Sequence, residues 1–495
     1  MLCTVGLFAI TLSLQPLTHS PRSFSLRSPA AWLLSLALEL PFVILKDIRM
    51  EEKPILEKAE RIRDVIRYIK RFKNATVVIY LDDDIIDSPL FVSHIRDIAL
   101  IHQAGLRVIL VPGARKKIDE YLSKNEISWT YENGIRITPV EAMPLIKNAA
   151  FDAANVVMTS LAGENLTAVI GNWVRARGKG VLGGVDFATA GEIDKLDDNT
   201  IKTILDSGFI PIFPCIGWSL NGKPYNISSA QLASQIATHL HADKLFFLLP
   251  NAELSRNYFE IPKDLGLSPE GCVPAMNIEE LGEFLEANEN QTNDSKKKII
   301  SMLRLAKKSV ESGVTRVHIL NGSIEGTLPC EIFSDLGSGT MIYKSNYGKF
   351  RAMRREDISA VLSLIRPFVS KEILLPRSEQ QMEAEYNDFI VYELDGAVRA
   401  CAALHIYDRT QAEIAALAVD ESCAHIGIGP KMIKYLIEKA KTVSIESVFI
   451  LTTQTADWFE KQGFAADSIE TLPERRRKIW NPKRGSKLFR LNLKK

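Results

Sequence analysis

The stretch LTTQTADWFEKQGF, residues 451–464, decides the fold of the C-terminal part of this chain, and Arg484-Gly485-Ser486 follows it. The apolar segment 447–451 predicts a buried strand, and the segment after the two threonines predicts a short helix that ends at a glycine turn. Elements in this order indicate a mixed α/β unit. Arg484 and Ser486 add a guanidinium and a hydroxyl, two groups that can hold a carboxylate.

Segments before this stretch extend the unit back to about residue 348. Residues 388–394 and 397–405 predict two strands joined by a hairpin at Asp395-Gly396, and residues 413–419 predict a third. A helix is expected from Asp357, and Pro367 should end it.

A glycine turn, Gly427-Ile428-Gly429, joins the strand at 413–419 to an amphipathic helix with Pro430 at its first position. The N–H groups of such a helix start can hold a pyrophosphate, although a plain turn explains a lone Gly-x-Gly equally well. The surrounding order of elements is what favours a ligand site here.

The N-terminal part alternates apolar strands with helices and predicts an open, mostly parallel sheet between helices. Ser88-Pro89 predicts a helix start, with Ser88 as N-cap and Pro89 at the first helical position. The expected strands cover residues 75–81, 107–111, 168–172, 209–213, 244–249 and 316–320. The glycine of Pro112-Gly113 follows a strand at the edge where α/β folds place anionic ligands.

Composition narrows the classes of partner. The chain has 495 residues, enough for two or three domains, and a formal net charge of +1, which gives no basic field for nucleic acid or an anionic membrane. Its six cysteines include no Cys-x-x-Cys pair, so neither a zinc site nor a disulfide framework is expected. We expect small-molecule ligands, further copies of the chain as partners, and no metal.

The first fifty residues differ from the rest. No acidic residue occurs before Glu39, and serines and arginines gather between residues 20 and 28. This bias is typical of an organelle transit peptide, and a secretory signal is the competing interpretation. We expect residues 1–50 to be a leader for the chloroplast, with the mitochondrion as second choice.

Several long motifs occur in both parts of the chain. Besides residues 451–464, the motifs in the C-terminal part are IRPFVSKEILLPRS (365–378), ACAALHIY (400–407), AEIAALAV (412–419), LPERRRK (472–478) and RGSK (484–487). The motifs in the N-terminal part are IALIHQAGLRVILVPGARKKID, GNWVRARGKGVLGGVDF and EIFSDLGSGTMI. In this order they resemble the N-acetylglutamate synthase family in its bacterial and plant form. The resemblance implies an α/β amino-acid-kinase-like domain at 51–345 and an α+β GNAT-type N-acetyltransferase domain at 348–495.

The resemblance implies that the α-amine of L-glutamate attacks the thioester of acetyl-CoA directly, the first step of arginine biosynthesis. Glu413 matches the family's base position and would remove a proton through water, although a salt-bridged strand glutamate is the alternative. Thr452 and Thr453 lie where the family has hydroxyls near the leaving thiolate, and they also suit an ordinary strand.

Arg377, Arg484 and Ser486 match the family's glutamate-binding positions, and guanidinium forks suit a dicarboxylate. The resemblance also places acetyl-CoA, the co-substrate, at Leu417, Val419, His425, Ile426, Gly427, Ile428 and Gly429. The loop departs from the family because Cys423 stands where a basic or amide residue is usual, and Pro430 removes one N–H. Both changes predict weaker binding of acetyl-CoA.

In the family, the kinase-like domain binds L-arginine as an effector and mediates homo-oligomerisation. Glu331 would pair with the guanidinium, and the turn formed by Gly337, Gly339 and Thr340 would receive the amino-acid end. Phosphoryl transfer is not expected, since Asp82-Asp83-Asp84 stands where kinases have a glycine-rich opening and would repel phosphate.

Three alternatives to a glutamate N-acetyltransferase follow from these departures. The chain would be a catalytically weak paralogue that binds arginine or CoA and regulates, an acetyltransferase for another amine, or an acetylglutamate kinase. The missing glycine at 82–84 argues against the kinase.

Overall fold

The structure is a computed structural model that describes residues 62–63, 65–66, 69–70, 72–132, 134–263, 265–268, 270–333, 337–344, 348–394, 396–420, 423 and 427–493. The expected leader at 1–50 lies outside the described residues, as do His425 and Ile426. The domain boundaries therefore stay predictions.

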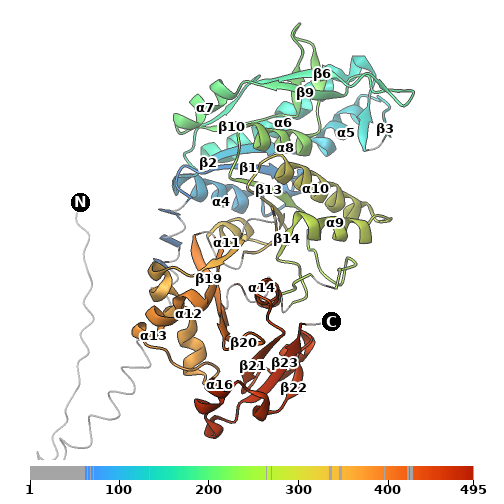
Figure 1. Cartoon of the computed structure of the whole chain (residues 1–495). Coiled ribbons are helices and arrows are strands. Elements are labelled where there is room, and N and C mark those ends of the chain that lie inside the picture. The colour runs from blue at the N-terminus through green and yellow to red at the C-terminus, as the bar shows by residue number, and fades with distance from the viewer. Residues whose placement is uncertain are drawn as a thin grey trace, which may run out of the picture. The chain divides into compact units, whose positions relative to one another are not determined.

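An eight-stranded sheet forms the N-terminal domain, drawn from blue to yellow in Figure 1. Its strands pair in parallel except β15 with β16, which confirms the predicted mostly parallel sheet. In sheet order they are β14 (Ala275–Asn277), β16 (Thr340–Tyr343), β15 (Arg316–Asn321), β13 (Lys244–Leu249), β1 (Thr76–Leu81), β2 (Arg107–Pro112), β10 (Ile210–Ile212) and β5 (Ala168–Ile170).

Helices cover both faces of this sheet, which explains the continuous apolar runs of its strands. Val77 and Ile79 of β1 pack into one core, with α4, α6 and α11, while Val78 and Tyr80 pack into the other, with α8, α9 and α10. The helices are α3 (Asp83–Ile86), α4 (Phe91–Gln103), α5 (Arg115–Lys124), α6 (Met143–Gly163), α7 (Asp198–Asp206), α8 (Ser229–His239), α9 (Ile278–Ala287), α10 (Asp294–Glu311) and α11 (Thr327–Phe333).

Smaller strands complete this domain. A four-stranded sheet has the order β12 (Pro224–Asn226), β11 (Ile216–Trp218), β6 (Val174–Gly178) and β9 (Gly191–Leu196). Two ribbons are formed by β3 (Thr130–Glu132) with β4 (Ile135–Ile137), and by β7 (Val181–Leu182) with β8 (Val185–Asp186).

The C-terminal domain is built on a seven-stranded, mixed sheet, in orange and red in Figure 1. All neighbours are antiparallel except β20 with β21. The order is β17 (Gly348–Ala352), β18 (Phe389–Leu394), β19 (Ala397–Ile406), β20 (Gln411–Val419), β21 (Ser447–Thr452), β23 (Lys487–Asn492) and β22 (Ala465–Asp467). The helices are α12 (Ile358–Ser370), α13 (Glu379–Glu385), α14 (Ile428–Thr442), α15 (Ala456–Lys461) and α16 (Glu474–Lys478).

Alternate residues of the strands point to opposite faces of this sheet, and each face packs against different helices. Ile414 of β20 packs in a core with Met432 and Leu436 of α14. On the opposite face, Val361 and Ile365 of α12 pack against residues of β18 and β19. The sheet is thus covered by helices on both sides, as in the expected α+β domain.

Three predicted helix boundaries are wrong. Helix α4 begins at Phe91, because the chain first forms the short helix α3 and the Ser88 hydroxyl donates to the Ile85 carbonyl instead of capping α4. Helix α12 continues past Pro367 to Ser370, since a proline so near the end removes only one helical hydrogen bond. Pro430 is the third residue of α14, where its missing N–H has no partner within the helix.

Candidate active site and effector regions

Strands β20 and β21 separate in the middle of the C-terminal sheet. They pair from Gln411–Ser447 to Glu413–Phe449, and beyond that point no residue that the structure describes pairs with β20 on this side. A register shift against β19 leaves Ala416 with a φ of 52°, a strained value for a residue with a Cβ. The opening therefore presents free backbone groups of β20, next to the half-buried Leu417 and Val419, to a ligand.

The start of α14 belongs to the same domain. Gly427 caps the helix with a φ of 70°, which favours glycine, and Ile428 is buried. A Cβ on Gly429 would lie 3.2 Å from the Trp458 ring, so this glycine allows close packing of α14 and α15. The N–H groups of Ile428 and Gly429 in the first turn and the helix dipole favour an anion here.

Glu413 is buried on β20 and its carboxylate has three hydrogen-bond donors. Arg476 of α16 donates from Nε at 2.6 Å and from Nη2 at 3.2 Å, and the Tyr407 hydroxyl donates at 3.0 Å. Burial, followed by the charge of Glu413, raises the pKa of Tyr407, so the phenol remains a donor. The salt-bridged state of Glu413 is observed, and its catalytic role stays a prediction.

The predicted glutamate-binding side chains come from two segments. The Arg377 guanidinium lies 5.6 Å from the centre of the Phe389 ring, while Nη2 of Arg484 donates to the carbonyl of Ile373, four residues before Arg377. Burial and then the charge of Arg476 lower the pKa of Arg484.

Ser486 follows Arg484 by two residues, and its hydroxyl accepts from Nε1 of Trp480 at 3.2 Å. The role of Ser486 toward a dicarboxylate stays a prediction.

The two threonines differ in their surroundings. The Thr452 hydroxyl is bonded to the hydroxyl of Thr455 at 2.8 Å and accepts from its N–H at 3.0 Å, which closes the turn into α15. Thr453 is exposed. Their roles toward a leaving thiolate stay predictions.

The sequence interpretation assigned no role to Arg476, Tyr407 or Ala416. Arg476 is the middle of three consecutive arginines, and only the tertiary contact singles it out. Nothing in an Ala-rich strand marks the strained residue Ala416. These residues become recognisable only once β20 is placed beside α16 and β19.

The predicted effector residues Glu331, Gly337, Gly339 and Thr340 do lie together in the N-terminal domain. Oε2 of Glu331 accepts from the N–H groups of Ser338 and Gly339, and Oε1 lies 2.5 Å from Nδ1 of His318. Burial alone would raise the pKa of Glu331, but His318 and the backbone amides lower it to about 2.

The backbone and the close contacts of this turn explain why glycine stands at residues 337 and 339. Gly337 has a φ of 65°, and a Cβ there would lie 2.6 Å from Oε2 of Glu331. A Cβ on Gly339 would lie 2.4 Å from the carbonyl oxygen of Ile319, and the buried Thr340 hydroxyl donates to the Val273 carbonyl at 2.6 Å. The effector role of these residues stays a prediction.

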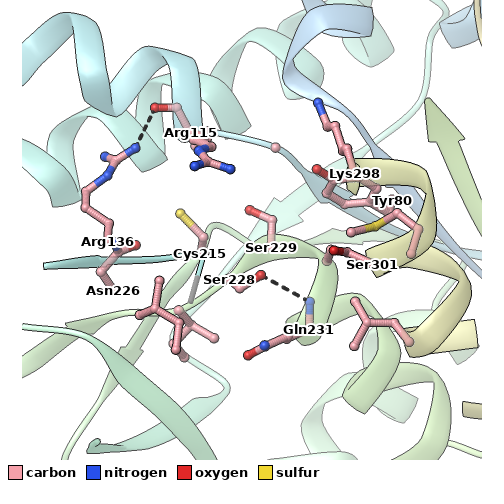
Figure 2. A pocket seen from close by; sticks show the side chains of 18 of the residues that line it. Tyr80, Arg115, Arg136, Cys215, Asn226, Ser228, Ser229, Gln231, Lys298 and Ser301 are labelled. Carbon is pink, nitrogen blue, oxygen red and sulfur yellow. Dashed lines mark hydrogen bonds between the residues drawn. The ribbon is translucent and has the colours of Figure 1, made fainter. Parts of the chain in front are cut away.

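A cavity of about 1010 Å³ lies elsewhere in this domain, beside the carboxyl ends of β1 and β2. Figure 2 shows Arg115 and Arg136 on one side of it and Lys298 with Tyr80 on the other. Because it is lined only by residues of the N-terminal domain, it is separate from the predicted acetyl-transfer residues.

The carboxylates of Asp82, Asp83 and Asp84 come within 4.8 Å of one another at the end of β1. Lys298 of α10 lies 2.7 Å from Asp82 and offsets part of this charge. Burial, then the charge of Asp83, raises the pKa of Asp82 to about 6. The cluster thus includes a cation that the sequence interpretation did not foresee.

Within the described part of the chain, no helix combines the length and the apolar character that crossing a membrane requires.

Two family models match the chain, one for each domain. The Amino acid kinase family matches residues 55–321, and the Acetyltransferase (GNAT) family matches residues 357–464. Both agree with the sheets described above and confirm the predicted fold class.

Curated relatives and solved structures cover nearly the whole chain. Amino-acid acetyltransferases of Pasteurella multocida and of Buchnera aphidicola are 32% and 30% identical; the matches span 85% and 88% of this chain and 94% and 98% of theirs. N-acetylglutamate synthase from Neisseria gonorrhoeae, solved with coenzyme A and L-arginine, is 30% identical, with a TM-score of 0.72 over 88% of this chain and 99% of that one. Its complex with coenzyme A and N-acetyl-glutamate gives a TM-score of 0.54 over the same shares. This chain therefore belongs to the amino-acid acetyltransferases, the N-acetylglutamate synthase family, in which a GNAT acyltransferase domain follows an amino-acid-kinase fold.

Proposed function

We propose that this enzyme binds L-glutamate through Arg377, Arg484 and Ser486 and acetylates its α-amine directly from acetyl-CoA. The observation that carries the proposal is the hydrogen bond from Arg484 to the carbonyl of Ile373, which joins Arg484 to the segment that leads to Arg377. Arg476, which pairs with Glu413, belongs to the same domain. A substrate with two carboxylates would neutralise this cationic region.

Each part of the reaction has a matching feature. The free edge of β20 beyond Glu413 suits the extended arm of acetyl-CoA, and the first turn of α14 at Gly427 suits its phosphates. Thr452 ends the neighbouring strand β21 and Thr453 follows it, at the position proposed for the leaving thiolate. The amine must lose a proton before it attacks the thioester carbon.

We also propose that L-arginine is an effector of the kinase-like domain, at Glu331 and the turn from Gly337 to Thr340. The proposal is supported by the complex of the Neisseria gonorrhoeae enzyme with arginine. Because the Glu331 carboxylate already accepts from His318 and two backbone amides, a guanidinium would have to share or displace these donors. Arginine binding would therefore rearrange the turn itself.

Two further proposals concern cell biology and assembly. We propose that residues 1–50 direct the chain to the chloroplast, which a fluorescent fusion of these residues would test. We propose a homo-oligomer as well, which the mass of the purified protein in solution would test.

The experiment that tests the activity measures CoA-thiol release by the full chain with acetyl-CoA and glutamate, with and without arginine. Arg484→Ala should raise the KM for glutamate roughly 10- to 100-fold through loss of a charge-assisted contact, and leave the KM for acetyl-CoA unchanged. Lys483→Ala is the matched control, since Lys483 is the exposed neighbour of Arg484.

The alternatives predict other outcomes. Folded protein that binds arginine but releases no CoA would favour the regulatory paralogue. Activity that does not depend on glutamate, or an Arg484→Ala variant with an unchanged KM, would point to a different amine.

A further inference from the structure

The cavity of about 1010 Å³ in the N-terminal domain has a cationic lining. Among the described residues that line it, seven are lysines or arginines and two, Asp83 and Asp294, are carboxylates. Arg304 and Lys308 of α10 form no ion pair with another residue that the structure describes. A concave site with this excess of positive charge favours an anionic ligand.

The strand end at Gly113, where the sequence predicted an anionic ligand, is filled by the protein itself. A Cβ on Gly113 would lie 2.7 Å from the backbone nitrogen of Asp83, so the glycine allows this turn to pack against the end of β1. The Asp83 carboxylate accepts from the N–H of Lys116, in the first turn of α5, at 2.7 Å. Because a carboxylate of the chain occupies this helix start, an anionic ligand must bind elsewhere in the cavity.

The start of α8 is a second helix start at the cavity. Ser228 caps the helix by accepting from the N–H of Gln231, a hydrogen bond that Figure 2 marks. The N–H groups of Ser229 and Ala230 form no hydrogen bond with another described residue, as is usual for the first positions of a helix, and both residues line the cavity. These donors and the helix dipole favour a negatively charged group.

A buried guanidinium with an unused donor lines the same cavity. The Arg136 side chain is 4% exposed, and its Nη2 lies 2.8 Å from Oδ1 of Asp119 and donates to the Arg115 carbonyl at 2.9 Å. Nη1 of Arg136 is buried and has no hydrogen-bond partner among the described residues. Since a buried donor of a charged group is costly to leave unpaired, we infer that a ligand supplies the missing acceptor. Arg115 adds a second guanidinium beside it (Figure 2).

We propose that this cavity binds a small organic acid with two or more carboxylates. One carboxylate accepts from Arg136, Arg115 and the start of α8, and another lies near the cations of α10. Planar guanidinium groups match the two oxygens of a carboxylate, whereas Asp83 in the wall disfavours the denser charge of a phosphate chain. The proposed arginine effector residues, Glu331 and the turn 337–340, do not line this cavity, so the two sites are separate.

The test titrates the full chain with citrate, a tricarboxylate, by isothermal titration calorimetry at constant pH and ionic strength. Neither acetyl-CoA nor glutamate is present, so the result does not depend on the proposed activity. Citrate should bind saturably, and acetate, with one carboxylate, should bind at least about tenfold more weakly, because it lacks a second charge-assisted contact. Inorganic phosphate should also bind more weakly than citrate.

Matched variants locate the site. Arg115→Gln should weaken citrate binding about tenfold, and Lys124→Gln should not change it, since Lys124 is exposed on the same helix α5 but does not line the cavity. Ser229→Pro removes one N–H at the first residue of α8, where proline is tolerated, and should also weaken binding about tenfold. Ser229→Ala keeps this N–H and should bind within about threefold of wild type.

Arg136→Gln should abolish measurable citrate binding. Because Arg136 also pairs with Asp119, the melting curve of this variant is recorded alongside. If the variant does not fold, Arg115→Gln and Ser229→Pro decide the question, since Arg115 is exposed and proline suits the first position of a helix.

Three outcomes overturn the proposal. The first is wild-type protein that does not bind citrate, or that binds it with the same affinity as Arg115→Gln and Ser229→Pro. The second is citrate binding that is lost in Arg484→Ala and kept in the cavity variants, which would place citrate at the predicted glutamate site. The third is phosphate that binds more tightly than citrate and depends on Arg115, which would assign the cavity to a phosphate ligand.

Discussion

Replacing Arg476 by Gln should destabilise the C-terminal domain far more than the same change at its neighbour Arg477. The Arg476 side chain is 13% exposed and its partner Glu413 is 6% exposed, so the substitution leaves a carboxylate buried without its cation. Breaking a buried ion pair costs roughly 3–5 kcal/mol. Since both groups keep some access to water, we expect about 3 kcal/mol.

The loss of about 3 kcal/mol should be measurable as a lower melting temperature. For a domain of this size, 1 kcal/mol corresponds to roughly 2–4 °C in Tm, so Arg476→Gln should lower the melting temperature by about 6–12 °C. Arg477 is exposed and donates to the Glu470 carbonyl at 3.3 Å, and its replacement should cost no more than about 0.5 kcal/mol. Differential scanning calorimetry of the three proteins at pH 7 measures both values.

A double-mutant cycle tests the reason for the loss. If the cost comes from an unpaired Glu413, adding Glu413→Gln to Arg476→Gln should recover part of the stability, with a coupling energy of about 1–3 kcal/mol. The same Tm loss in Arg476→Gln and Arg477→Gln, or strictly additive effects in the cycle, would refute the reasoning.

Three further predictions concern other buried or strained groups. Folding raises the pKa of Asp82 to about 6, so the native state binds the extra proton and the free energy of unfolding falls as pH rises from about 4 to 6. In urea titrations, Asp82→Asn should reduce this fall in the free energy of unfolding by about 2 kcal/mol. Asp84→Asn is the control, since Asp84 is half-exposed and should not change the fall. Glu331 has a lowered pKa of about 2, so the ionised carboxylate stabilises the folded state above the unfolded pKa near 4.5, and this stabilisation is lost as pH falls through 2. Glu331→Gln should lower the free energy of unfolding by about 2–3 kcal/mol at pH 7 and make its decline in acid shallower. An unchanged decline would contradict this assignment. Gly427→Ala must place a Cβ at a φ of 70°, which costs about 1 kcal/mol and should weaken acetyl-CoA binding by calorimetry; equal affinity would show that this turn does not contact the cofactor.

Long apolar segments allowed the sequence to predict the sheet architecture. Residues 244–249 form a strand whose two faces are both buried, and its composition alone indicates this. The start of α4 was misplaced at Ser88 because the competing helix α3 depends on Asp82, whose carboxylate accepts from the N–H of Asp84. Local propensity cannot rank two adjacent helix starts whose choice depends on the fold.

For the candidate site, too, the sequence predicted one part and only the structure showed the other. The chain order of Arg377, Glu413, Arg484 and Ser486 resembles the family, and this was visible in the sequence. The sequence did not show which partner each charged group has, because the partners are distant in the chain. Arg476 lies 63 residues from Glu413, and Lys298 lies 216 residues from Asp82. Sequence periodicity determines which face of an element is apolar and hence the domain folds. Only the tertiary structure decides which charged side chains meet where little water reaches them, and these contacts determine which carboxylates have a cationic partner.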